Sequence, residues 1–95
     1  MKKFKWVNIF NTEGQQKSLI EFVSKNTIIF HGMVFSDEFS IKIAARDKNR
    51  ELKTVEENIP SVEEGMIAVE KFLFDSGVLV EGDEIEYEPQ ESKEQ

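Results

Sequence analysis

The chain has 95 residues, 39% of them apolar, and a formal net charge of −7 at pH 7. This length allows one domain with one core, and the apolar content excludes an intrinsically disordered protein. The lack of cysteine excludes a disulfide framework, a thiolate metal site and a thiol nucleophile, and it is typical of a reducing compartment.

The first ten residues, MKKFKWVNIF, contain early lysines as a secretory signal does. Lys5 and Asn8 then interrupt the apolar stretch too early for such a signal, and no run approaches the roughly 18 apolar residues of a membrane span. We therefore expect a soluble, cytoplasmic protein. Its many Lys, Glu, Ile, Phe and Asn residues are typical of the AT-rich genomes of some bacteria and their phages.

Residues 3–46 predict four strands, because apolar and polar positions alternate with a period near two. The expected strands are residues 3–10, 17–24, 27–35 and 38–46, with turn residues between them. Such short turns favour an antiparallel meander. Residues 17–24 also suit a short helix, for which Thr12 and Gln15 can form a capping box, but their β-branched and aromatic content favours the strand.

Both faces of these strands are apolar. In the third strand, strict alternation places Ile28, Phe30 and Val34 on one face and Ile29, Met33 and Phe35 on the other. Gly32 indicates a bulge or a close approach of another backbone. We interpret His31, the only histidine, as a packed or hydrogen-bonded residue, because there is no second histidine or cysteine to share a metal.

Residues 61–77 predict an amphipathic helix. Ser61 and Glu64 fit a capping box, and Gly77 lies where a helix ends on a left-handed residue. The spacing of helical residues gives one core stripe: Val62, Met66, Val69 and Leu73. After Gly77, residues 78–80 and 84–88 predict one or two short edge strands.

These elements predict an α+β fold, with an antiparallel meander of four or more strands and one helix on one face. We expect one domain at residues 1–88 and a disordered acidic tail at residues 89–95. The helix predicted for residues 61–77 is about 24 Å long and covers only one face of the sheet. The other face then needs the C-terminal strands, a second subunit or a partner.

Charge is divided unevenly along the chain. Residues 1–53 hold ten Lys or Arg and six Asp or Glu, a net charge of +4, whereas residues 54–95 hold two Lys and thirteen Asp or Glu, a net charge of −11. The strand half is therefore mildly basic, and the helix half with its tail is strongly acidic. The acidic tail either only solubilises the protein or steers a basic partner toward it.

The helix also carries a predicted contact patch. Ile67 and Phe74 lie away from the core stripe, on the same side as Glu63 and Glu70, which is typical of a partner-binding surface. The leading hypothesis is a small non-enzymatic interaction protein of bacterial or phage type. It acts as a homodimer or docks its acidic helix and tail on a basic protein surface, as a nucleic-acid mimic or inhibitor.

The alternative hypothesis is a nucleic-acid-binding module in which the acidic tail competes with the ligand. Aromatic and basic side chains together suit single-stranded nucleic acid. The residues for this role are Lys3, Lys5, Trp6, Arg46, Lys48 and Arg50. Asp47 and Glu51 separate the basic residues of the 46–53 loop, so ordinary solvation of that loop is the competing interpretation.

No nucleotide-binding, calcium-binding or nucleophile signature occurs in the sequence. Ser76-Gly77 is explained as the end of the helix rather than as a nucleophile. We therefore expect neither catalysis, nor a cofactor, nor a metal site. A catalytic carboxylate pair that assembles only in space leaves no trace in a sequence with nineteen Asp and Glu residues.

Overall fold

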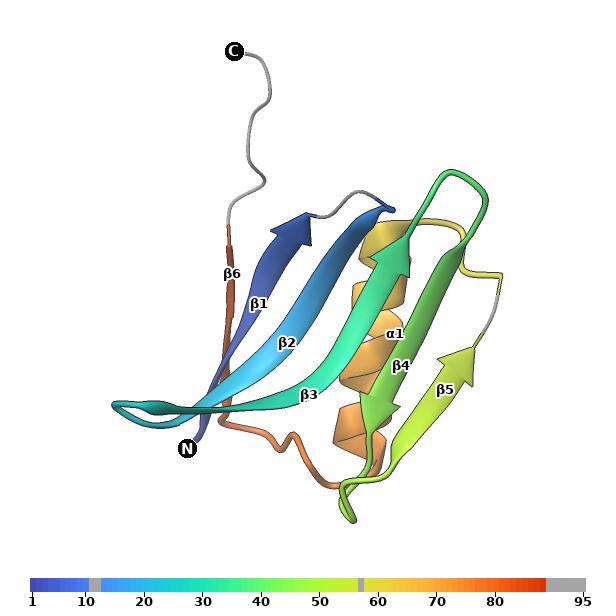
Figure 1. Cartoon of the computed structure of the whole chain (residues 1–95). Coiled ribbons are helices and arrows are strands. Elements are labelled where there is room, and N and C mark those ends of the chain that lie inside the picture. Colours follow the sequence, from blue (N-terminus) through green and yellow to red (C-terminus); the bar gives the residue numbers. More distant parts are fainter. Residues whose placement is uncertain (11–12, 57, 89–95) are drawn as a thin grey trace.

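Six strands form one sheet with one helix behind it, within residues 1–10, 13–56 and 58–88, which the computed structural model describes (Figure 1). In chain order the elements are β1 (Lys3–Phe10), β2 (Gln15–Ser24), β3 (Thr27–Ser36), β4 (Ile41–Arg46), β5 (Leu52–Glu56), α1 (Val62–Asp75) and β6 (Glu84–Tyr87). This confirms the expected α+β class. The tail expected at residues 89–95 lies outside the described residues.

The strands lie in the order β5-β4-β3-β2-β1-β6. All neighbouring pairs are antiparallel except β1 and β6, which are parallel, with Trp6 opposite Tyr87. Residues 17–24 belong to a strand, as favoured from their composition, and an edge strand forms within the expected range 84–88. Residues 78–80 form no strand.

The expected order of strands omitted β5, because the composition of residues 46–53 predicts a loop. Asp47 builds a tight turn there: its Oδ1 accepts hydrogen bonds from the backbone N–H of Asn49 (2.9 Å) and Glu51 (3.0 Å), and Arg50 has a φ of 69°. The chain then returns beside β4. Lys53 and Thr54 are exposed and polar, which is usual on an edge strand. A search for alternating apolar residues therefore does not detect this strand.

The helix begins and ends close to the positions that its caps predict. Ser61 is the N-cap, and its Oγ accepts a hydrogen bond of 3.1 Å from the backbone N–H of Glu64. Gly77 has a φ of 82°, which is the left-handed conformation that terminates helices. Beyond it, the N–H groups of Val78 and Leu79 both donate to the carbonyl of Leu73.

The core lies between α1 and the sheet, with α1 mainly over β3 and β4. Val69 and Leu73 are fully buried, and Val62 and Met66 pack against the core from its edge, so the predicted stripe is confirmed. The buried apolar residues are Phe4, Trp6, Leu19, Val34, Ile43, Ala44, Ala45, Ile59, Val69, Leu73, Val78 and Leu79. Glycine at 65 lets α1 approach the sheet closely, because a Cβ there would lie 2.9 Å from Cγ1 of Val34.

A shift of register in β3 changes which residues share a face. Leu19 pairs with Gly32, but the next residue, Ile20, pairs with Phe30, so His31 is the extra residue of a bulge. Strict alternation predicted Phe30 and Met33 on opposite faces, and that prediction is wrong. The bulge brings both to the face away from α1, whereas Gly32 faces α1, where a Cβ would lie 2.8 Å from Cγ1 of Val69.

Within the described residues, no helix has the length and the apolar composition that a membrane crossing requires.

Candidate functional site

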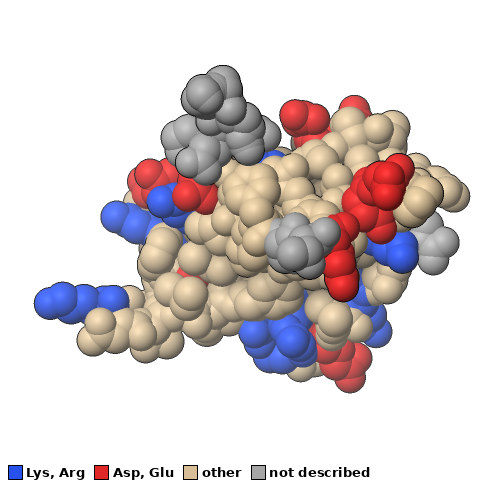
Figure 2. Space-filling model, turned by 45° about the horizontal axis from the view of Figure 1, so that its top comes forward, with Lys and Arg blue, Asp and Glu red and all other residues tan. Residues whose placement is uncertain are grey.

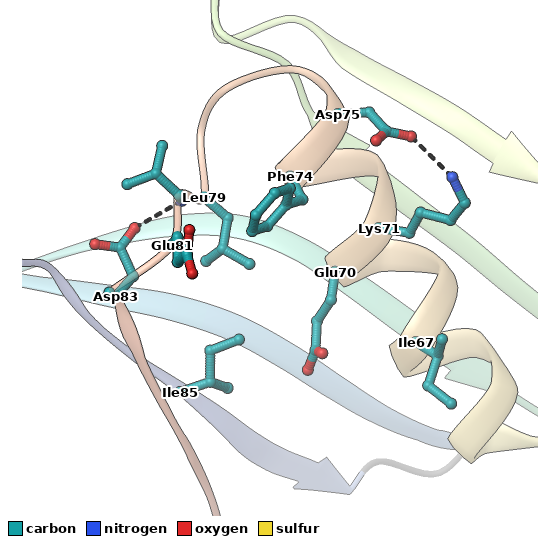
Figure 3. A pocket seen from close by; sticks show the side chains of 11 residues that line it. Ile67, Glu70, Lys71, Phe74, Asp75, Leu79, Glu81, Asp83 and Ile85 are labelled. Atoms are coloured by element: carbon teal, nitrogen blue, oxygen red, sulfur yellow. Dashed lines mark hydrogen bonds and ion pairs between the residues drawn. The ribbon is translucent and has the colours of Figure 1, made fainter.

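A groove lies between α1 and the segment 79–85 that leads into β6 (Figure 3). It has a volume of about 470 Å³, and we call it the helix groove. Its lining residues are Ile67, Glu70, Lys71, Phe74, Asp75, Leu79, Val80, Glu81, Gly82, Asp83 and Ile85. Figure 3 shows Phe74 of α1 close to Leu79 of the facing segment, to which Ile85 also belongs.

The two apolar contact residues predicted from the sequence both line this groove. Ile67 is 60% exposed and Phe74 is 51% exposed, so no described strand covers either side chain. Glu63 lies beside a smaller hollow that shares Ile67 and Glu70 with the groove and is also lined by Tyr87. The structure thus brings together all four of the predicted contact residues along one side of α1.

Glu70 has a second role, because it is bonded into the fold. Its Oε2 accepts a hydrogen bond of 2.8 Å from the indole Nε1 of Trp6 and one of 2.7 Å from the hydroxyl of Tyr87. Partial burial, the hydrogen bond to Glu70 and the negative charge of Glu70 together raise the pKa of Tyr87 to about 12. Glu70 therefore joins α1 to β1 and β6 and fixes one wall of the groove.

The groove is acidic. Four carboxylates and one ammonium group line it, which leaves a net charge of −3. Lys71 donates a hydrogen bond of 3.1 Å to Asp75, one turn further along α1. Burial raises the pKa of Asp83. Hydrogen bonds from the backbone N–H groups of Lys2 and Val80, together with the charge of Lys2, lower it, and the net result is a pKa below the ordinary value of this carboxyl.

The sheet face away from α1 is a second candidate surface, which we call the open sheet face. No helix or strand of the described residues covers it. The large apolar side chains on this face are Val7, Ile9, Ile20, Phe22, Ile28, Phe30, Met33, Phe35 and Leu52. Figure 2 shows part of it obliquely: uncharged side chains fill the middle, and charged side chains lie mostly around the margin.

The residues of the nucleic-acid hypothesis are divided between the two sides of the sheet. Lys3 and Lys5 lie on the open sheet face. Trp6 points the other way and is 1% exposed, so its ring is covered by the core. Arg46 lies over the ring of Phe30, with 5.8 Å between its guanidinium carbon and the ring centroid.

The other two basic residues of that hypothesis lie below the end of the helix. The guanidinium of Arg50 donates a hydrogen bond of 3.1 Å to the carbonyl of Phe30 and lies 3.5 Å from Nδ1 of His31. The side chain of Lys48 lies next to Gly77. No continuous track of cations with an exposed aromatic ring therefore results from the six residues.

His31 is packed and hydrogen-bonded, as interpreted from the sequence. Its ring is buried against Phe4, with 5.3 Å between the ring centroids, and its Nε2 lies 2.8 Å from a carboxylate oxygen of Glu21. Burial is the largest influence and lowers the pKa of His31, the hydrogen bond and charge of Glu21 raise it, and the positive charges of Arg50 and Lys2 lower it, with a lowered pKa as the net result. The imidazole is therefore neutral near pH 7.

Sequence reasoning missed the far wall of the helix groove, which Leu79, Val80 and Ile85 form, and the hydroxyl of Tyr87. The alternation of EIEYE places Ile85 and Tyr87 on one face of a strand, which was the available signal. That pattern does not show that β6 pairs with β1.

No family model matches this chain, and no curated protein or solved structure is detectably similar to it. Function must therefore be inferred from the helix groove and the open sheet face.

Proposed function

We propose that this chain is a small non-enzymatic interaction protein whose helix groove binds a basic amphipathic segment of a protein partner. The observation that supports this most directly is the exposed pair Ile67 and Phe74 in a groove with a net charge of −3. Apolar side chains of the partner fill the groove, and its Lys or Arg side chains meet the surrounding carboxylates.

The apolar floor supplies the affinity. Burial of apolar surface is worth about 25 cal/mol per Å², and an aromatic side chain near the centre of a contact is a frequent hot spot. Phe74 is about half exposed, so much of its ring is free to be covered by a partner. Because Glu70 is held by Trp6 and Tyr87, the groove is already formed before the partner binds.

The surrounding charge selects the partner. Residues 54–95, which include α1 and β6, carry a net charge of −11. An acidic surface of this kind accelerates association with a basic one and repels acidic surfaces. Proteins that bind nucleic acid have basic surfaces, so occupation of such a surface makes this chain a nucleic-acid mimic or an inhibitor.

The nucleic-acid hypothesis has less support. Trp6 is buried, and Lys3 and Lys5 lie opposite Glu84 and Glu86 in the pairing of β1 with β6, so that negative charges flank both cations. Phosphate binding gains from unpaired cations, and these two lysines have carboxylates as neighbours.

The test uses two synthetic helical peptides of matched length, one of Leu and Lys and one of Leu and Glu. We expect the Leu/Lys peptide to bind, with shifts in the NMR signals of Ile67 and Phe74, and to bind more weakly as salt is raised. The variant Ile67→Asp with Phe74→Ser should fold normally and lose this binding. As a matched control, Phe39→Ser removes a ring that is 86% exposed in the loop before β4, and it should bind as the wild type does.

Two results would count against the proposal. Equal binding of the Leu/Lys and Leu/Glu peptides means that the carboxylates of the helix groove do not select a basic partner. Unfolding of the double variant, seen by circular dichroism, means that Ile67 and Phe74 belong to the core in spite of their exposure.

A further inference from the structure

The open sheet face has an ordered distribution of charge across its strands. Lys5 of β1 pairs with Ile20 of β2, Ile20 pairs with Phe30 of β3, and Arg46 of β4 lies over the Phe30 ring. On the other side, Lys5 lies next to Glu86 of β6. One row across the sheet therefore reads Arg46, Phe30, Ile20, Lys5, Glu86, with a cation at one end and a carboxylate at the other.

This row is self-complementary about its central residue. Arg46 lies two strands from Ile20 on one side, and Glu86 lies two strands from it on the other. A two-fold axis parallel to the strands and above Ile20 therefore places Glu86 of each copy opposite Arg46 of the other, and Lys5 opposite Phe30. The apolar stem of Lys5 can cover the Phe30 ring of the other copy, while its ammonium group lies toward the carboxylate of Glu86.

The next rows fit the same axis. Val7, Ser18 and Met33 form the row above, in which Val7 of one copy faces Met33 of the other. In the row after that, Ile9 of one copy faces Phe35 of the other, with Gln16 at the axis. In these two rows the apolar residues of β1 therefore meet apolar residues of β3, and in the row through Ile20 opposite charges meet at the edges.

We propose that the open sheet face binds a second copy of this chain, face to face, about a two-fold axis parallel to the strands over Ile20. The two sheets pack as an aligned sandwich, about 10 Å apart. Glu86 and Arg46 of opposite copies form two symmetric ion pairs at the edges of a central apolar contact. This interface is on the side of the sheet opposite the helix groove, so dimerisation leaves the groove free.

The size of the face suits this occupant. With the axis over β2, the five strands from β4 to β6 of each copy overlap; at about 4.8 Å spacing they are about 24 Å wide, and the ten residues of β3 at about 3.3 Å each make the sheet about 33 Å long. A patch of that width and two thirds of that length has roughly 500 Å², before the relief of the side chains is added. A stable interface of standard size buries about 800 Å² on each partner.

The decisive experiment is a charge swap measured by sedimentation equilibrium. Glu86→Arg alone and Arg46→Glu alone each place like charges opposite one another twice in the dimer, so each should raise the monomer–dimer dissociation constant by roughly tenfold or more. An equimolar mixture of the two variants should regain dimers, because in a mixed dimer each of the two edge contacts again joins one guanidinium and one carboxylate. Native mass spectrometry should show these dimers to be mixed.

Matched controls are reversals of charge on the other side of the molecule. Glu64→Arg on α1 and Lys53→Glu on β5 are exposed, lie away from the open sheet face, and should leave the dissociation constant unchanged. Ile20→Glu places two carboxylates at the axis and should abolish the dimer with the fold intact by circular dichroism. This variant also keeps the test decisive if Arg46→Glu fails to fold after losing its contact with Phe30.

Three results would overturn the proposal. The first is a wild-type chain that stays monomeric at the highest concentration at which it remains in solution. The second is a mixture of two folded charge variants that does not regain dimers. The third is binding of single-stranded DNA by the monomer, abolished by Arg46→Glu, which would assign the same face to nucleic acid.

Discussion

The indole nitrogen of Trp6 donates a hydrogen bond of 2.8 Å to Oε2 of Glu70, and this contact joins the first strand to the middle of the helix. Trp6 is 1% exposed, so water has little access to the indole if the carboxylate is removed. A buried donor without an acceptor destabilises a fold more than the bond itself stabilises it.

We expect Glu70→Ala to lower the free energy of unfolding by about 2 kcal/mol. The measurement is urea denaturation followed by the fluorescence of Trp6, the only tryptophan. Glu63→Ala, two turns earlier and exposed, is the control and should change stability by less than about 0.5 kcal/mol. Equal losses in the two variants would show that the contact with Trp6 contributes nothing.

Tyr87 is the only tyrosine, so the absorbance of tyrosinate reports on this residue alone. We expect a titration midpoint near the pKa of about 12, and a lower midpoint in Glu70→Gln, which removes the negative charge beside the phenol. Because the folded pKa lies above the ordinary value of 10, the contact stabilises the fold below pH 10 and loses its effect as the pH rises toward 12. A wild-type midpoint at 10 would contradict this.

Because His31 is buried, we expect the stability of the fold to fall in mild acid. Its pKa is lower in the folded protein than the ordinary 6.5, so the unfolded chain takes up the proton first as the pH falls. The stabilising effect of the neutral ring is therefore complete above pH 6.5 and is lost as the pH falls from there through the folded pKa.

Denaturation between about pH 7.5 and about pH 5.5 should show this loss in the wild type and a flatter profile in His31→Gln. Glu21→Gln removes the carboxylate that raises the pKa of His31, so NMR titration of the ring should show an even lower value in that variant. Parallel stability profiles in wild type and His31→Gln would mean that other groups cause the acid sensitivity.

Gly65→Ala should destabilise the fold, although alanine usually stabilises a helix interior relative to glycine. The added Cβ would lie 2.9 Å from Cγ1 of Val34 and 3.1 Å from Cγ2 of Ile43, so we expect a loss of about 1–3 kcal/mol by thermal or urea denaturation. Val34→Ala makes room for the new methyl group. The double variant should therefore lose less stability than the two single variants added together.

The features that the sequence predicted well are those set by nearby residues. The caps at Ser61 and Gly77 and the apolar stripe ending at Leu73 depend on residues within one helix, so the helix was predicted nearly to its ends. The exposure of Ile67 and Phe74 followed from the same periodicity. Half of the helix groove could thus be predicted from the helix alone.

The features that the sequence did not predict depend on distant partners. The bulge at His31 exists because β3 must pair with β2 and also let Gly32 approach Val69 on α1. Local alternation contains neither constraint, so Phe30 and Met33 were wrongly predicted to lie on opposite faces. The far wall of the groove was likewise unpredictable, because β6 is placed by pairing with β1 rather than by its own composition.

The pairing of β6 with β1 has a consequence for the nascent chain. Lys2 and Asp83, which are hydrogen-bonded at the start of this pairing, are 81 positions apart in the sequence. The first five strands and the helix therefore leave the ribosome while the outer edge of β1 still presents unpaired backbone N–H and C=O groups, which can pair with a strand of another chain. Lys3 and Lys5 on β1 repel a second copy of the same strand. We therefore expect these lysines to limit such pairing in the newly made chain until Glu84 and Glu86 lie beside them.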